Sequence, residues 1–187
     1  MMSEDPVVEL MLEWHMQNGN VSLIEPKLFL GGCDVLQAFG NAFIREFGIR
    51  LIVSCAQEIE YSVESIPILR VPLQDRETQK LWPDILIASH AIEAAHNAGG
   101  AVLVICAAGV SRSAAVVLFH LMRTQKLTLD EAFDKVAARR KCINPNPGFV
   151  DQLRAMQQHL RCPSECQIEL RPIPKHLINF DDEDRII

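Results

Sequence analysis

The chain has 187 residues, of which 49% are hydrophobic and 22% are charged, and this length predicts one well-packed domain with short extensions. Its formal net charge is −6. Nucleic acids and anionic membrane surfaces both select a basic protein face, so an acidic chain is a poor match for either as its main partner. Any site for an anion must therefore be built locally.

Residues 1–20 are expected to form a helix outside the core, and acidic residues stand where a secretory signal would carry cations. Residues 21–160 are the predicted domain, and 161–187 are a predicted tail, because three prolines precede an acidic end. No segment approaches the roughly 20 apolar residues of a membrane-spanning helix. These features predict a soluble protein of the cytoplasm or nucleus.

Within the domain, the hydrophobic pattern predicts strands that come to alternate with helices. Two short strands are expected within 22–32, further strands over 49–55, 66–73 and 101–106, and helices over 34–48, 84–100, 111–126, 128–141 and 146–160. The strand AVLVIC is apolar on both faces, as a central strand covered on both sides would be. The predicted fold class is α/β, with a central, mostly parallel sheet flanked by helices.

The last three helices carry clear signals in their sequences. The helix over 111–126 is apolar nearly all round, which predicts a buried central helix. Thr128 and Glu131 form a predicted capping box at the start of the next one. Asn146 and Pro147 are typical of a cap and a first helical residue.

The six cysteines are predicted to be reduced thiols, because they include no CxxC pair and no dense framework. Cys162 and Cys166 have the wrong spacing for a usual zinc knuckle and lack a second ligand pair. The helical histidines have no ligand partner at a useful spacing, and His120 is assigned to the core. No metal or other cofactor is predicted.

The segment AVLVICAAGVSR contains the candidate residues for an anion site and a reactive thiol. A predicted strand ends at Cys106 and a helix begins near Arg112, which leaves residues 107–111 to turn the backbone. Backbone N–H groups curved around one point, beside the positive end of a helix, bind phosphate without a basic surface. The Arg112 fork would hold two oxygens, and the same field would lower the pKa of the Cys106 thiol. The alternative is a buried cysteine followed by a surface arginine.

The spacing from Cys106 to Arg112 resembles the Cys-x-x-x-x-x-Arg loop of the cysteine-dependent protein phosphatases, and AAGVSRSAA is similar to the small, atypical dual-specificity subgroup. LFLGG resembles that subgroup's early strand and turn, VPLQD its acid loop, and INPNPGFVDQL the beginning of a late helix. The resemblance covers about residues 21–160. It implies the fold of the protein tyrosine phosphatase superfamily and hydrolysis of phosphate monoesters.

The resemblance also implies roles for individual residues. Cys106 would attack phosphorus in line and form a phosphocysteine that water hydrolyses. Asp75 would protonate the leaving oxygen and later activate the water, with Glu77 and Asp84 as rival acids. Ser113 would donate to the sulfur, or is simply a first-turn helix residue. The residues implied to hold the phosphate are Ala107, Ala108, Gly109, Val110, Ser111 and Arg112.

One position departs from the family pattern, because Ile105 stands where a histidine normally precedes the cysteine. That histidine helps to hold the loop and lowers the thiol pKa, so its replacement is expected to weaken thiolate formation without abolishing it. Good strand packing is the alternative explanation of Ile105. Asn146 matches a family asparagine that braces the loop, but its role as a helix cap is sufficient, and it is assigned as structural.

Two functions are consistent with these residues. The first is a phosphoprotein phosphatase that accepts phosphotyrosine and phosphoserine or phosphothreonine, because the chain lacks room for the additions that deepen a tyrosine-only pocket. The alternative is a pseudophosphatase that binds phosphoproteins with little turnover, which Ile105 favours. A phosphoinositide phosphatase would be expected to have extra cationic residues in the loop, and the segment AAGVS contains none. The expected partner is a phosphoprotein substrate.

Cys55 ends the predicted strand 49–55 as Cys106 ends the strand 101–106. Carboxyl ends of parallel strands gather at one edge of a sheet, so the two thiols are expected to lie close together. The segment SCAQE resembles the one that carries a back-door cysteine in some phosphatases of the superfamily. The hypothesis is a Cys55–Cys106 disulfide under peroxide, and the alternative is a small apolar strand residue.

Overall fold

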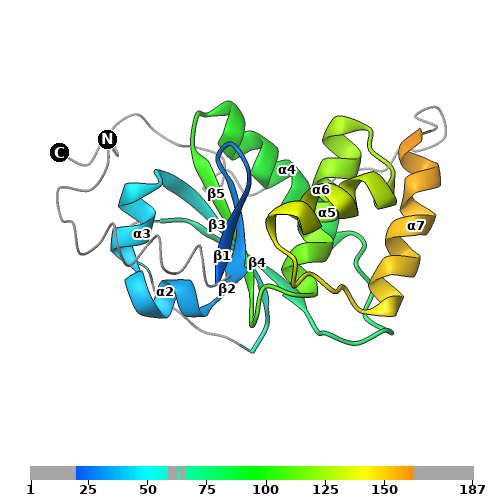
Figure 1. The fold of residues 1–187 in the computed structure, drawn as a ribbon, viewed down its shortest axis with the longest axis horizontal. Coiled ribbons are helices and arrows are strands. Elements are labelled where there is room, and N and C mark those ends of the chain that lie inside the picture. The colour runs from blue at the N-terminus through cyan, green and yellow to red at the C-terminus, as the bar shows by residue number, and fades with distance from the viewer. Residues whose placement is uncertain (1–19, 59–62, 64–65, 162–187) are drawn as a thin grey trace.

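The structure, a computed structural model, describes residues 20–58, 63 and 66–161 (Figure 1). Its five-stranded sheet has the order β1-β2-β5-β3-β4. β1 pairs antiparallel with β2, and the other three pairings are parallel. The strands are β1 (Val21–Glu25), β2 (Leu28–Gly32), β3 (Ile49–Ala56), β4 (Ile68–Leu73) and β5 (Ala101–Cys106). The predicted α/β class with a mostly parallel sheet is confirmed.

Helices cover both faces of this sheet (Figure 1). They are α2 (Asp34–Phe39), α3 (Asn41–Glu46), α4 (Asp84–Asn97), α5 (Arg112–Gln125), α6 (Leu129–Arg139) and α7 (Pro147–Arg161). The first two pack on one face of the sheet, α4 and α5 pack on the opposite face, and α6 and α7 lie on that same side against α5. The hydrophobic core is therefore divided by the sheet into two clusters.

The central strand β5 is buried over its whole length, as predicted. Because side chains alternate along a strand, its residues enter the two clusters in turn. Val104 and Cys106 belong to the cluster beneath α4 to α7, whereas Leu103 and Ile105 belong to the cluster beneath α2 and α3. The cysteine of the expected loop and the isoleucine before it thus face opposite sides of the sheet.

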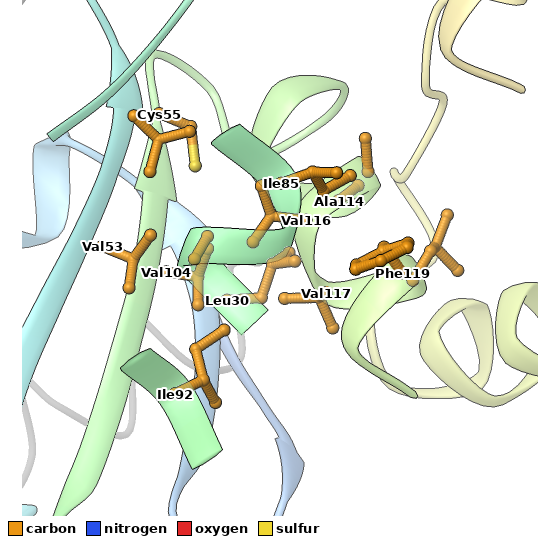
Figure 2. Packing of buried hydrophobic residues seen from close by; sticks show 14 of the residues in the cluster. Leu30, Val53, Cys55, Ile85, Ile92, Val104, Ala114, Val116, Val117 and Phe119 are labelled. Atoms are coloured by element: carbon orange, nitrogen blue, oxygen red, sulfur yellow. The ribbon is translucent and has the colours of Figure 1, made fainter. Parts of the chain in front are cut away.

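The helix α5 is the buried central helix that its composition predicts, and every residue from Arg112 to Met122 is buried. Figure 2 shows Val116 and Val117 directed toward Leu30 and Val104 of the sheet, in one apolar cluster. Packing of this kind fixes the axis of α5 against β5. The first turn of α5 is therefore held at the edge where β5 ends.

The segment 34–48 corrects one prediction, because it forms the two helices α2 and α3 and not a single helix. Gly40 separates them with φ 43°, and its N–H donates to the Leu36 carbonyl at 2.9 Å. A residue in the left-handed region ends a helix, and glycine adopts it without steric cost. The apolar period continues across Gly40, which is why periodicity alone predicts one helix.

Both predicted helix caps are confirmed. The Thr128 side chain accepts from the Glu131 N–H, and the Glu131 carboxylate accepts from the Thr128 N–H at 2.7 Å. Asn146 Oδ1 accepts from the Phe149 N–H at 3.0 Å at the start of α7. These caps fix where α6 and α7 begin.

The predictions for residues 1–20 and 161–187 fall almost wholly outside the described residues. The same is true of Cys162 and Cys166. Among the residues that the structure does describe, no helix has the length and apolar character needed to cross a membrane.

A polar network lies between α4 and α5, and Ser89 and His120 are its buried members. Within it, the Nδ1 atom of His120 lies 3.1 Å from the hydroxyl oxygen of Ser89, and Arg123 Nε donates to the same hydroxyl at 2.8 Å. Arg123 also pairs with Glu93 at 2.6 Å. Burial, with the nearby charges of His96 and Arg123, lowers the pKa of His120 to about 4. The histidine assigned to the core is thus kept neutral by its surroundings.

This network predicts a specific acid sensitivity of stability. The pKa of His120 falls from an ordinary 6.5 to about 4 on folding, so its contribution is complete above pH 6.5 and lost as pH falls toward 4. Between pH 7 and pH 5 the free energy of unfolding should fall by about 2 kcal/mol more in the wild type than in His120→Asn. Urea unfolding at both pH values measures this difference. The exposed control His159→Asn should behave as the wild type does, and an equal loss in all three proteins would contradict the assignment.

Candidate active site

The loop 107–111 joins β5 to α5 across the turn that the sequence predicts. Gly109 adopts φ 66°, and a Cβ added there would lie 2.4 Å from the backbone carbonyl carbon of Gly31. Only glycine fits this combination of a left-handed backbone and a close backbone neighbour. The loop therefore packs directly on the end of β2, with no side chain between them.

Cys106 lies at the base of this loop and is 3% exposed. The Ser113 hydroxyl donates to Sγ at 3.2 Å, and the backbone N–H groups of Ser113, Val110 and Gly109 also donate to the sulfur. Burial alone raises the pKa of a thiol, but these donors outweigh it and hold the pKa of Cys106 below its ordinary value. The surroundings of the sulfur favour the thiolate.

The Arg112 side chain lies beside this sulfur and is 6% exposed as a residue. Its Nη1 donates to both oxygens of Glu58, at 2.6 and 2.8 Å, and to the Leu73 carbonyl at 3.4 Å. Burial works against the cation, but Glu58, Cys106 and Asp75 raise the pKa of Arg112 above its ordinary value.

One donor of Arg112 is buried without a partner. Its Nε has no hydrogen-bond acceptor in the part of the chain that the structure describes. A buried donor of this kind is unfavourable unless an oxygen accepts from it. Because Nη1 is occupied by Glu58, the other edge of the guanidinium, made by Nε and Nη2, suits the oxygens of a phosphate.

Glu58 is a site residue that the sequence analysis missed. It follows the end of β3, and its side chain is 55% exposed even though it binds the buried Arg112. Partial burial raises its carboxyl pKa, but the hydrogen bonds from Arg112 reverse this and lower the pKa below its ordinary value. Its position just after a parallel strand was the available signal, since the ends of such strands meet at one edge.

The structure brings Asp75 to the same loop. Its Oδ1 accepts from the Ser111 hydroxyl at 2.6 Å and from Asn146 Nδ2 at 2.8 Å. Ser111 Oγ in turn accepts from the Asn146 N–H at 3.1 Å. Asn146 therefore does more than cap α7, because it also holds the carboxylate of the predicted acid.

The two rival acids, Glu77 and Asp84, are not hydrogen-bonded to the loop 107–111 as Asp75 is. Asp84 lies in the first turn of α4, where a carboxylate complements the helix dipole. Glu77 packs its backbone against the start of α7, since a Cβ added at Gly148 would lie 2.1 Å from the Glu77 carbonyl oxygen. Neither hydrogen-bonds to the loop residue Ser111, whose hydroxyl binds Asp75.

The acid loop, residues 74–81, is held by α7. Gln152 Oε1 accepts from the Leu81 N–H at 2.9 Å, and Gln152 Nε2 donates to the Gln79 carbonyl at 2.8 Å. Leu81 is fully buried in the core. A single glutamine thus fixes two backbone groups of the acid loop, which steadies the position of Asp75.

Ile105 is fully buried in the apolar cluster beneath α2 and α3. Its side chain contributes packing and has no polar atom with which to hold the loop. The strand-packing explanation of this residue therefore fits the structure.

Cys55 lies in the same apolar cluster as Cys106, on the adjacent parallel strand, where Ser54 pairs with Ile105. Burial, followed by the neighbouring Cys106, raises the pKa of the Cys55 thiol well above its ordinary value. The strands β3 and β5 are adjacent and parallel, so their carboxyl ends lie at one edge of the sheet, as predicted. All four cysteines within the described residues are free thiols. The described residues contain no group of three His, Cys, Asp or Glu side chains that could hold a metal.

Comparison with known proteins places this geometry in a family. Residues 28–159 match the model of the dual specificity phosphatase catalytic domain. Human dual specificity phosphatase 28 is 37% identical to the chain, and the match covers 78% of this chain and 82% of that protein. The crystal structure of human DUSP28 matches with a TM-score of 0.72 at 34% identity, over 76% of this chain and 96% of that one.

A longer relative matches over the same region. Human dual specificity protein phosphatase 1 is 35% identical over 82% of this chain, but the match spans only 41% of that protein's length. The region matched by the family model includes Cys106 and Arg112, and the family resemblance stated from the sequence is confirmed. The chain belongs to the dual specificity phosphatases, which are cysteine-dependent protein phosphatases of the protein tyrosine phosphatase superfamily.

Proposed function

We propose that this chain is an active phosphatase that hydrolyses phosphotyrosine and phosphoserine or phosphothreonine in proteins through a phosphocysteine intermediate. One observation carries the proposal. The Cys106 sulfur is surrounded by hydrogen-bond donors that lower its thiol pKa, beside an Arg112 whose Nε is buried without a partner in the described chain. A nucleophile and an oxyanion site thus stand side by side.

In the first step, the Cys106 thiolate attacks phosphorus and the bond to the substrate oxygen breaks. The charged oxygens are held by Arg112 and by the N–H groups of the loop 107–111. The leaving oxygen takes its proton from Asp75. Ser111 and Asn146 both donate to Oδ1 of Asp75, so we assign the proton transfer to Oδ2.

In the second step, water attacks the phosphocysteine and the phosphorus–sulfur bond breaks. Asp75, now ionised, accepts a proton from the water. The leaving group is the Cys106 thiolate, which receives the hydrogen bond from Ser113. Inorganic phosphate departs, and both groups return to their starting protonation states.

The rim of the loop supports a broad substrate range. Ala107 and Ala108 are exposed and have short side chains. They place no bulk above Cys106, so a phosphate on a short serine or threonine side chain would not be kept away from the sulfur. A phosphotyrosine, whose phosphate lies farther from its backbone, would reach the same point.

A second candidate function is a pseudophosphatase that binds phosphoproteins with little turnover. The observation that favours it is Ile105, an apolar residue where the family normally has a histidine. The two candidates share the phosphate-binding loop and differ in whether Cys106 completes a reaction.

Turnover of an aryl phosphate by the wild type and by Cys106→Ser separates the two candidates. The phosphatase proposal expects steady release of phosphate by the wild type and at least about a thousandfold less by the variant. Isothermal calorimetry with tungstate, an oxyanion of phosphate shape, shows whether the loop binds in each protein. Equal, negligible rates together with tungstate binding would support the pseudophosphatase.

Substitution of the acid should depend on the leaving group. Asp75→Asn should lower turnover of a phosphoserine peptide by about two to four orders of magnitude, because its alkoxide leaving group needs a proton. The loss should be smaller for an aryl phosphate with an acidic phenol. Glu77→Gln, in the same loop, is the matched control and should retain its rate. A reversed pattern would give the role of the acid to Glu77.

Mild peroxide should link Cys55 to Cys106. Peroxide oxidises the thiolate to a sulfenic acid, and the Cys55 thiol then displaces water to form the disulfide. Peptide mapping should find this bond in the wild type, and Cys55→Ser should convert Cys106 to sulfinic acid several-fold faster. Equal rates of sulfinic acid formation in both proteins would leave Cys55 as a packing residue only.

A further inference from the structure

The outer side of the phosphate loop rests on one buried cation. Arg140 ends α6, is 3% exposed, and reaches back to the loop. Its Nε donates to the Gly109 carbonyl at 2.7 Å, and its Nη2 donates to the Ala108 carbonyl at 3.0 Å. Nη1 lies 3.5 Å from the Ser22 hydroxyl of β1. The planar guanidinium therefore grips two successive carbonyls in a fork.

The carbonyls of Ala107 and Val110, which flank this pair in the chain, also accept hydrogen bonds from residues outside the loop. The Ala107 carbonyl accepts from the Cys33 N–H at 3.2 Å and from its thiol at 3.4 Å. The Val110 carbonyl accepts from the Asn144 N–H at 2.9 Å. Four consecutive carbonyls thus face outward, and Arg140 holds the central pair.

The direction of these carbonyls fixes the direction of the amides. In a planar trans peptide, the C=O of one residue and the N–H of the next point opposite ways. An outward Ala108 carbonyl therefore turns the Gly109 N–H inward, and an outward Gly109 carbonyl does the same for the Val110 N–H. These two N–H groups are among the donors to the Cys106 sulfur. Arg140 thus holds two of the peptide planes that surround the nucleophile.

The close packing around Gly109 makes this contact rigid. A Cβ added at Gly109 would lie 2.6 Å from Arg140 Nη2 and 2.4 Å from the Gly31 carbonyl carbon. The loop is clamped between the guanidinium and the end of β2. Ile105 lies on the other face of the sheet and offers no hydrogen bond to the loop.

We propose that Arg140 is a positioning residue that holds the phosphate loop in its nucleophile-activating, oxyanion-binding shape from the side opposite the substrate. The proposal rests on the proposed function for its role in turnover. It acts through the Ala108–Gly109 and Gly109–Val110 peptides and makes no contact with the phosphate itself. Arg112 binds the phosphate from inside the loop, and Arg140 shapes the loop from outside.

Two readouts test the proposal without turnover. The pH dependence of iodoacetamide alkylation reports the Cys106 thiol pKa, and calorimetry with tungstate reports oxyanion binding. In Arg140→Ala, the midpoint of the alkylation profile should move upward by about one pH unit, because two donors to the thiolate lose their orientation. Tungstate binding should weaken by about tenfold or more, because two inward N–H groups lose their orientation. The exposed neighbour Arg139 supplies the matched control, and Arg139→Ala should leave both readouts unchanged.

A second variant separates geometry from charge and guards against loss of the fold. Arg140→Lys keeps the cation and most of the buried stem but cannot bond both carbonyls in a fork. It should therefore recover only part of the thiol reactivity and oxyanion affinity. Full recovery by lysine would assign the effect to charge and overturn the positioning role. The proposal would also fail if folded Arg140→Ala and Arg140→Lys matched Arg139→Ala in both readouts, a result that leaves the phosphatase proposal untouched.

Discussion

Five residues separate a fully buried strand from a buried helix, and within that length the chain must turn while every carbonyl of residues 107–110 faces outward. The amides that face inward are what concentrate positive potential on the Cys106 sulfur. An anion site made from backbone dipoles needs no basic surface. This explains how a chain with a net charge of −6 builds a loop suited to an anion.

The remaining parts of the site come from distant segments that meet at the same edge of the sheet. Glu58 arrives from the end of β3 and holds the buried Arg112, while Asp75 follows β4 and is held by Ser111 and Asn146. Because β3, β4 and β5 pair in parallel, the carboxyl ends of these strands lie together. The sheet topology is thus the reason that Cys106 and Asp75, which lie on different loops, meet at one edge of the sheet.

Much of this arrangement is predictable from the sequence because its signals are local. The strand, loop and buried helix around Cys106, the capping box at Thr128 and the cap at Asn146 each depend on neighbouring residues. Glu58 and the hydrogen bond from Asn146 to Asp75 were not predicted, because they depend on contacts between segments far apart in the chain. The break at Gly40 was missed for a different reason, since one left-handed residue interrupts a helix without disturbing the apolar period.

The attachment of the acid loop to α7 bears on how the domain can be dissected. Gly148 touches the Glu77 backbone, Gln152 binds the loop at two points, and Asn146 binds Asp75. All five strands precede α7, so a fragment cut before this helix would still contain every strand and the sequence of the loop 107–111. It would nevertheless lose the residues that hold Asp75 and the acid loop. A fragment that keeps the candidate site assembled must therefore include the last helix as well as the sheet.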